Sequence, residues 1–303
     1  MQHVNLCRFG KRGFTWMYDL ADKKLLTKTA QLLAKNGIPE PELSAKYLIQ
    51  GSKPEKSKRA QNLDIESFLG NLKRRLNREP IQYILGDWDF YNVNLIMRPP
   101  ILIPRPETEE LVEFFIRSIS NQKPLYILDV GTGSGAIGLA IANEKRFHFQ
   151  LRCMGIDVDP RACELANENS ARLSLTDRYI CLPAVSIRDF NTLEKFDYIV
   201  SNPPYIPTKD ISSLQPEVRL YESHQALDGG GNDGGEIPTL ILRRSIDLLK
   251  KGGEIFMELH FSHTKEVIEN WIQKIGGQRT FRILESKKDF AGIERFWRLQ
   301  KIE

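Results

Sequence analysis

The hydrophobic residues in the first quarter of the chain recur at helical spacing. Between Leu20 and Leu76, apolar side chains return every three or four positions, as they do along one face of a helix. Gly37 and Pro39 separate the first helical stretch from the second. The apolar positions are Leu25, Leu26, Leu32, Leu33, Leu43, Tyr47, Leu48, Ile65, Phe68, Leu69, Leu72 and Leu76. The pattern predicts a small helical domain over residues 19–79.

The pattern changes between Pro80 and Pro106 to short runs of aromatic and β-branched residues. Tyr83-Ile84-Leu85, residues 88–93 and residues 95–97 are such runs, and glycine or asparagine residues separate them. Runs of this kind indicate strands, so we predict a β-hairpin linker over residues 80–106. A helix follows it, with Thr108 as the predicted N-cap. The rest of the chain, 107–303, is predicted to form one α/β domain.

The first strand of that domain is predicted at residues 125–130 and leads into a glycine-rich turn. The turn is Gly131-Thr132-Gly133-Ser134-Gly135, and a helix is predicted over 136–143. Such a turn allows the backbone to approach a ligand closely at a helix N-terminus. A second strand ends at Asp157, where a carboxylate can bind ribose hydroxyls. These features fit either a dinucleotide or another nucleotide-type cofactor.

The fourth predicted strand, residues 196–201, ends at Asn202-Pro203-Pro204-Tyr205, which predicts the centre of an active site. Proline fixes φ and has no N–H, so the segment can neither extend the sheet nor begin a helix here. The Asn202 side-chain oxygen and the nearby carbonyls are acceptors, and Tyr205 offers an aromatic face. This set suits a planar N–H₂ group, because hydrogen bonds to its protons leave more electron density on nitrogen. An ordinary Asn-Pro turn is the alternative.

The acceptors at Asn202 distinguish the two kinds of cofactor. Gly133-x-Gly135-x-x-Gly138 satisfies the dinucleotide pattern, but the turn already begins at Gly131. Hydride transfer has no use for a cluster of acceptors, whereas methyl transfer to an amide or amine nitrogen does. The sequence therefore favours a methyl donor.

Composition narrows the class of protein further. The chain has 303 residues, 41% of them hydrophobic, and a formal net charge of +4, so it does not demand a nucleic-acid partner. Cys7, Cys153, Cys163 and Cys181 form no CxxC pair and are interpreted as reduced thiols. His260 and His263 are interpreted as loop residues, and we predict no metal site. No run reaches the roughly 20 apolar residues of a membrane span. We expect a soluble monomer.

The N-terminal segment, residues 1–18, carries three basic and no acidic residues between aromatic and aliphatic ones. This composition is typical of an organellar transit peptide, and a basic tail is the alternative. A transit peptide would direct the protein to an organelle, and a basic tail would leave it in the cytoplasm.

The order and spacing of several short motifs resemble those of the HemK/PrmC family, from about Leu20 to the C-terminus. The motifs are Glu79-Pro80-Ile81-Gln82-Tyr83-Ile84-Leu85-Gly86, Ile103-Pro104-Arg105-Pro106-Glu107-Thr108-Glu109, the 131–135 turn, Asn202 to Tyr205, Pro216-Glu217-Val218, Ala226-Leu227-Asp228-Gly229-Gly230 and Asp289-Phe290-Ala291-Gly292. In the hairpin, the residues Trp88-Asp89-Phe90 and Arg98-Pro99-Pro100 are most similar to those of the mitochondrial branch, which implies a mitochondrial location. The family consists of S-adenosylmethionine-dependent methyltransferases that modify the glutamine of the Gly-Gly-Gln motif in peptide-chain release factors.

The resemblance implies a fold and a set of site residues. The expected fold is α/β, a class I methyltransferase (Rossmann-like) sheet with helices on both faces. The cofactor would be S-adenosyl-L-methionine, and the partner a release factor acting in translation termination. Expected cofactor contacts are Gly131, Thr132, Gly133, Ser134, Gly135, Asp157, Ser186, Ile187 and Asn202, and expected catalytic residues are Asn202, Pro203, Pro204 and Tyr205. Ser186-Ile187 replaces an Asp-aromatic pair that is common in the family.

The roles that the resemblance implies place the glutamine at the motif that ends the fourth strand. Asn202 and the Pro203 carbonyl accept the protons of the glutamine amide, and Tyr205 packs against the amide plane. Two other functions remain open from the sequence. One is an adenine-N6 methyltransferase acting on DNA or RNA, which would need a basic channel. The other is a catalytically silent subunit that binds a translation partner.

Overall fold

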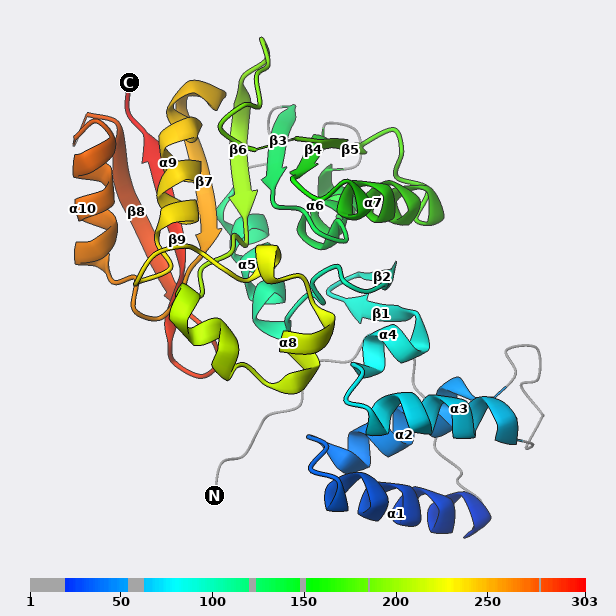
Figure 1. Cartoon of the computed structure of the whole chain (residues 1–303). Coiled ribbons are helices and arrows are strands. Elements are labelled where there is room, and N and C mark those ends of the chain that lie inside the picture. The colour runs from blue at the N-terminus through cyan, green and yellow to red at the C-terminus, as the bar shows by residue number, and fades with distance from the viewer. Residues whose placement is uncertain (1–19, 54–62, 120–123, 148–150, 185, 278) are drawn as a thin grey trace. The chain divides into compact units, whose positions relative to one another are not determined.

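The computed structural model describes residues 20–53, 63–119, 124–147, 151–184, 186–277 and 279–303 (Figure 1). The predicted transit peptide or basic tail at 1–18 lies outside these residues. The chain divides into two compact units. The first contains the chain up to Trp88 together with Gln215–Tyr221, and the second contains Asp89–Leu214 and Glu222–Glu303.

The first unit is helical, as its hydrophobic spacing predicts. Its helices are α1 (Leu20–Lys35), α2 (Pro41–Gly51), α3 (Ile65–Leu76), α4 (Ile81–Leu85) and α8 (Pro216–Tyr221). Leu33, Leu48 and Phe68 lie in its core, which burial of apolar area stabilises. Asp64 caps α3 by accepting a hydrogen bond from the Ser67 N–H at 3.1 Å.

The first run of the predicted hairpin is a helix. Tyr83-Ile84-Leu85 belongs to α4, which Pro80 precedes and which Gly86 ends with a φ of 82°. The two-stranded sheet consists of β1 (Asp87–Phe90) and β2 (Val93–Ile96). A three-residue apolar run does not distinguish strand from helix by periodicity, and here the flanking proline and glycine set the helix ends.

A segment far along the chain completes the helical unit. Glu217 on α8 is buried and forms ion pairs with Arg75 at 3.2 Å and Arg78 at 2.7 Å. The Tyr221 hydroxyl donates to the Asn77 carbonyl at 2.7 Å. Burial lowers the pKa of Arg75, and Glu217 opposes that shift. The hydrophobic pattern of residues 20–76 does not indicate that α8 pairs with these helices.

The second unit contains a seven-stranded sheet with the order β5-β4-β3-β6-β7-β9-β8. The first five strands in this order, β5, β4, β3, β6 and β7, pair in parallel. Strand β9 is antiparallel to both of its neighbours, β7 and β8. Their bounds are β3 (Leu125–Val130), β4 (Leu151–Asp157), β5 (Tyr179–Pro183), β6 (Phe196–Ser201), β7 (Leu249–Glu258), β8 (Phe281–Lys288) and β9 (Glu294–Lys301). The chain leaves β3 toward one edge and β6 toward the other, so a crevice is expected at their carboxyl ends.

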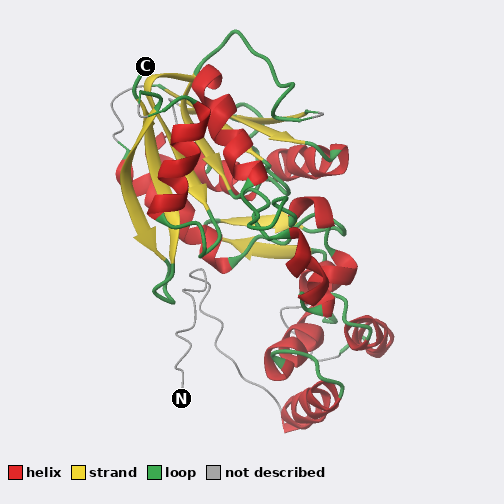
Figure 2. Cartoon of the chain, turned by 60° about the vertical axis from the view of Figure 1, so that its left-hand side comes forward, coloured by secondary structure: helices red, strands yellow, loops and turns green. Residues whose placement is uncertain are grey.

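Helices cover both faces of this sheet, because right-handed crossovers that run in opposite directions place their helices on opposite faces. Helices α9 and α10 pack together on one face (Figures 1 and 2). On the other side, the ring of Phe115 on α5 lies 5.1 Å from that of Phe256 on β7. The remaining bounds are α5 (Pro106–Ser118), α6 (Ala136–Ala142), η1 (Lys145–Phe147), α7 (Pro160–Arg172), η2 (Thr208–Ser213), η3 (His224–Ala226), α9 (Glu236–Leu248) and α10 (Lys265–Ile275). The predicted α/β fold is confirmed.

Other expectations concern single side chains. Thr108 is not the cap of its helix: α5 begins at Pro106 and has Arg105 at the N-cap position, because proline is favoured in the first turn. Cys153, Cys163 and Cys181 are free and buried, and Cys7 lies outside the described residues. Across the described ranges, no helix combines the length and apolar character that a membrane crossing requires.

Candidate active site

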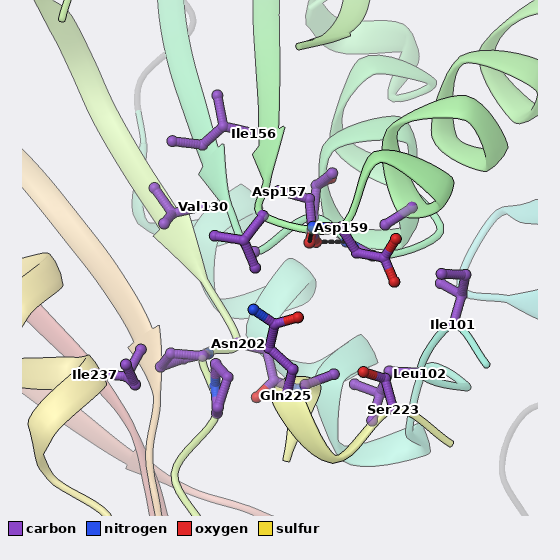
Figure 3. A pocket seen from close by; sticks show the side chains of 18 of the residues that line it. Ile101, Leu102, Val130, Ile156, Asp157, Asp159, Asn202, Ser223, Gln225 and Ile237 are labelled. Carbon is purple, nitrogen blue, oxygen red and sulfur yellow. Dashed lines mark hydrogen bonds between the residues drawn. The ribbon is translucent and has the colours of Figure 1, made fainter. Parts of the chain in front are cut away.

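A cavity of about 300 Å³ lies at the carboxyl ends of β3, β4 and β6. Figure 3 shows Asp157 and Asp159 on the wall formed by the end of β4 and the start of α7, and Asn202 on the wall formed by the end of β6. This is the crevice expected where neighbouring parallel strands send the chain in opposite directions. Every predicted cofactor residue except Gly135 lines the cavity.

The glycine turn between β3 and α6 takes a shape that side chains would prevent. Gly133 has a φ of 57°, in the left-handed region. A Cβ on Gly135 would lie 2.7 Å from Leu139 Cδ1, so Gly135 supports the turn from behind the cavity. A Cβ on Gly131 would meet no atom within 4 Å, so there is open space beside this residue, which also lines the cavity.

Asp129 holds this turn in place from the end of β3. Its Oδ2 accepts hydrogen bonds from the Thr132 hydroxyl at 2.5 Å and the Gly138 N–H at 3.0 Å. Burial raises the pKa of Asp129 to about 6, and these two hydrogen bonds oppose the shift. The Thr132 hydroxyl also lies 2.8 Å from the Tyr179 hydroxyl. Thr132 is therefore held by the protein, and this role of Asp129 was not predicted from the sequence.

Asp157 links the same turn to the end of β4. Its Oδ2 accepts a hydrogen bond from the Gly133 N–H and its Oδ1 one from the Asp159 N–H, both at 2.9 Å. Burial raises the pKa of Asp157, and the backbone hydrogen bonds oppose that shift. The carboxylate thus shapes the turn and also lines the cavity.

The remaining predicted cofactor positions form more of the wall. Ile187 is buried and joins the core beneath the sheet, which makes its part of the cavity apolar. Ser186 is half-buried, and its hydroxyl accepts a hydrogen bond from the Arg188 N–H at 3.1 Å. The Ser134 carbonyl accepts one from the Asn169 side chain at 2.9 Å.

Asn202, Pro203 and Pro204 line the cavity directly after β6. The Ser201 hydroxyl donates to the Val130 carbonyl at 2.7 Å and fixes the end of β6 against β3. The Asn202 side-chain Nδ2 donates to the Thr108 hydroxyl at 2.9 Å. Among the described residues, nothing donates to Asn202 Oδ1, which remains able to accept a hydrogen bond.

Tyr205 does not line the cavity, although it follows these residues directly. Its hydroxyl donates to Glu258 Oε1 at 3.0 Å, and its ring lies 6.1 Å from that of His260. Burial, followed by the neighbouring Glu258, raises the pKa of Tyr205. The packing of Tyr205 against a substrate amide stays a prediction.

Sequence reasoning missed Thr108 and Glu258 as parts of this site. The Thr108 hydroxyl donates to Glu258 Oε2 at 2.8 Å, so one buried carboxylate receives hydrogen bonds from both Thr108 and Tyr205. The available signal was a lone acidic residue at the end of the apolar run Ile255-Phe256-Met257. Ile101, Leu102, Ser223 and Gln225 also line the cavity and were likewise not predicted.

The sequence of this chain is similar to those of known methyltransferases. The profile of a family described as "Methyltransferase domain" matches residues 121–292. The chain is 37% identical over 302 residues to the MTRF1L release factor glutamine methyltransferase of Homo sapiens, covering 92% of this chain and 87% of that protein. It is 33% identical over 285 residues to the release factor glutamine methyltransferase of Fusobacterium nucleatum, covering 89% and 76%. For the protein of that name from Thermodesulfovibrio yellowstonii, identity is 41% over 234 residues, covering 76% and 79%.

Proposed function

The chain belongs to the family of release factor glutamine methyltransferases, and from this premise we propose that it methylates the side-chain amide nitrogen of the glutamine in the Gly-Gly-Gln motif of a peptide-chain release factor. The methyl donor is S-adenosyl-L-methionine. The observation that carries the proposal is the orientation of Asn202, whose Nδ2 is bound to Thr108 and whose Oδ1 is left as an acceptor beside the cavity.

The residues that line the cavity suit this cofactor chemically. The open space beside Gly131 leaves room for a ligand against the backbone of the turn. Asp157 supplies a carboxylate suited to ribose hydroxyls, and Ile101 and Ile187 supply apolar walls suited to a base. When bound, S-adenosylmethionine supplies an electrophilic methyl group on a sulfonium.

The protein's own residues would orient the amide nitrogen and adjust its charge. Asn202 Oδ1 and the Pro203 carbonyl would accept the two N–H₂ protons, which strengthens the nitrogen as a nucleophile. Holding the nitrogen in a fixed orientation toward the donor would supply most of the rate. The proton would leave the nitrogen after the methyl group has been transferred, when the alkylated nitrogen is acidic. No base is required before transfer.

The rest of the proposal concerns partners and location. The helical unit would recognise the release factor and the α/β unit would carry out the transfer, with the protein acting as a monomer without nucleic acid. The basic segment 1–18 and the resemblance of the hairpin residues to the mitochondrial branch of the family support a mitochondrial location.

The test is incubation of the full-length protein with S-adenosylmethionine and candidate release factors, followed by mass spectrometry of the Gly-Gly-Gln peptide. We expect one added methyl group on the glutamine. A release factor with glutamate at this position has no amide nitrogen and is expected to remain unmodified. Adenine-containing oligonucleotides serve as a second control. Methylation of an oligonucleotide in place of the glutamine, or of neither, would contradict the proposed function.

A further inference from the structure

Glu258 occupies a position from which one side chain can control two residues of the candidate site. It is the last residue of β7, and only 1% of its surface is exposed. One carboxylate oxygen accepts the Thr108 hydroxyl and the other accepts the Tyr205 hydroxyl, at 2.8 and 3.0 Å. Thr108 in turn accepts the Asn202 N–H at 2.9 Å. A continuous chain of hydrogen bonds therefore runs from the buried carboxylate to the cavity.

The ionised carboxylate determines the direction of every hydrogen bond in this chain. A carboxylate can only accept, so Thr108 must donate its single hydroxyl proton to Glu258. The lone pairs of Thr108 then face Asn202, which must present its N–H₂ to Thr108. With Nδ2 committed in this way, Asn202 Oδ1 is the group left to accept a substrate proton.

A protonated Glu258 removes this constraint. Its O–H can donate to Thr108, which frees the threonine proton to bind the amide oxygen of Asn202. The two orientations of the Asn202 carboxamide then become similar in energy, and one of them turns a donor toward the substrate. If the carboxyl proton lies on the other oxygen, the Tyr205 hydroxyl loses its acceptor.

The groups around Glu258 set the pH at which this change occurs. Burial raises the pKa of Glu258 to about 7, whereas Thr108, Tyr205 and the charge of Arg295 lower it and that of Glu107 raises it. Arg295 is itself paired with Asp289 at 2.6 Å. His260, two residues after Glu258, has a pKa lowered by burial. Of these groups, Glu258 is the one whose pKa lies near neutral pH.

We propose that Glu258 is a positioning residue that, when ionised, fixes the acceptor orientation of the Asn202 carboxamide through Thr108 and holds the Tyr205 phenol directly. The inference rests on the proposed function and adds to it a switch by protonation. Glu258 does not line the cavity, so it acts through Thr108 and Tyr205 and not on the substrate.

The kinetic test compares wild-type protein with Glu258→Gln and Thr108→Val across pH 5.5 to 8.5. In the wild type, kcat should fall about tenfold per pH unit below the pKa of about 7, because only the ionised form is competent. Each variant should lower kcat at pH 8 by about 10- to 10²-fold with little change in the KM for S-adenosylmethionine, which is less than the loss of a preorganised group that contacts the substrate directly. The acidic decline should disappear in Glu258→Gln.

Matched variants separate positioning from stability. Thr108→Ser keeps the hydroxyl and should recover most of the kcat that Thr108→Val loses. Glu254→Gln alters another buried carboxylate of β7, paired with Arg298 at 2.8 Å, and should lower the melting temperature without changing the pH profile. His260→Gln should keep the acidic decline. Full kcat in folded Glu258→Gln, or an acidic decline that follows His260, would overturn the inference.

A readout without substrate distinguishes this inference from the proposed function. In nitrogen-15-labelled protein, the side-chain amide signals of Asn202, assigned with Asn202→Asp, should shift across pH 6 to 8. The shift should be lost in Thr108→Val and kept in Thr108→Ser. If release factors are not methylated but the shift behaves in this way, the relay stands and the proposed function fails. If the signals do not change with pH, or if Thr108→Val preserves their shift, the relay is wrong.

Discussion

Asp157→Asn separates the two tasks that the structure gives to one carboxylate. Asp157 accepts one backbone hydrogen bond on each oxygen, from Gly133 and from Asp159. Asparagine has nearly the same shape but keeps only one acceptor oxygen, so its N–H₂ must face one of these two donors. The variant therefore weakens the glycine turn and removes the negative charge from the cavity wall.

The expected magnitude follows from the hydrogen bonds that change. A hydrogen bond to a charged group contributes about 1.5–3 kcal/mol, which corresponds to roughly 10- to 150-fold in cofactor affinity if one such bond to the ribose is lost. The loss of stability should be smaller, about 1–2 kcal/mol. A neutral asparagine avoids the free-energy cost of burying a charge, the effect that raises the pKa of Asp157.

Calorimetric titration with S-adenosylmethionine and thermal unfolding without ligand measure the two effects separately. Asp64→Ala is the control, since it removes the cap of α3 in the helical unit and should cost about 1 kcal/mol of stability without affecting cofactor affinity. Wild-type affinity in folded Asp157→Asn would refute the placement of the ribose at this carboxylate.

Four further predictions address other parts of the molecule. Asn202→Ala should lower methyl transfer by about 10²- to 10³-fold while cofactor affinity changes far less; unchanged turnover would make the Asn-Pro-Pro segment a structural turn. Gly155→Ala would place a Cβ 2.3 Å from the Tyr179 hydroxyl oxygen and should cost about 1–3 kcal/mol by thermal unfolding, with weaker cofactor binding because Tyr179 contacts Thr132. The folded pKa of Glu258 lies above its ordinary value of 4.5, so its contribution to the free energy of unfolding should fall as pH rises from about 4.5 to 7; Glu258→Gln should lose that slope. Removal of residues 1–18 should preserve activity in vitro but abolish mitochondrial import, and a reporter carrying these residues that stays in the cytosol would argue against a transit peptide.

Local sequence signals predicted the elements that carry the candidate site. A continuous apolar run predicts a buried strand, and a glycine turn or an acidic residue directly after it predicts a ligand-facing edge, as at Gly131 and Asp157. Parallel pairing then brings residues from separate strands to one edge. The family resemblance is confirmed by the sequence comparisons.

Long-range pairing accounts for what the sequence did not predict. Thr108 and Glu258 are 150 positions apart, and neither shows its partner in its own segment. Threonine is a residue type that often caps helices, but this helix already begins at Pro106. The Thr108 hydroxyl is therefore available to bond Glu258 and Asn202. The Tyr83-Ile84-Leu85 run has strand-like residues, but it is too short for its own pattern to decide between helix and strand.

The return of α8 to the helical unit determines how this protein can be recombined with its relatives. A chimera that exchanged only the chain up to Trp88 would leave Glu217 behind, and its two arginine partners would be replaced by residues of foreign origin. An unpaired buried charge costs about 3–5 kcal/mol, enough to consume much of the stability of a small domain. The unit to exchange is therefore discontinuous in the sequence. A hybrid that takes the N-terminal helices from one protein should take residues 215–221 from the same protein.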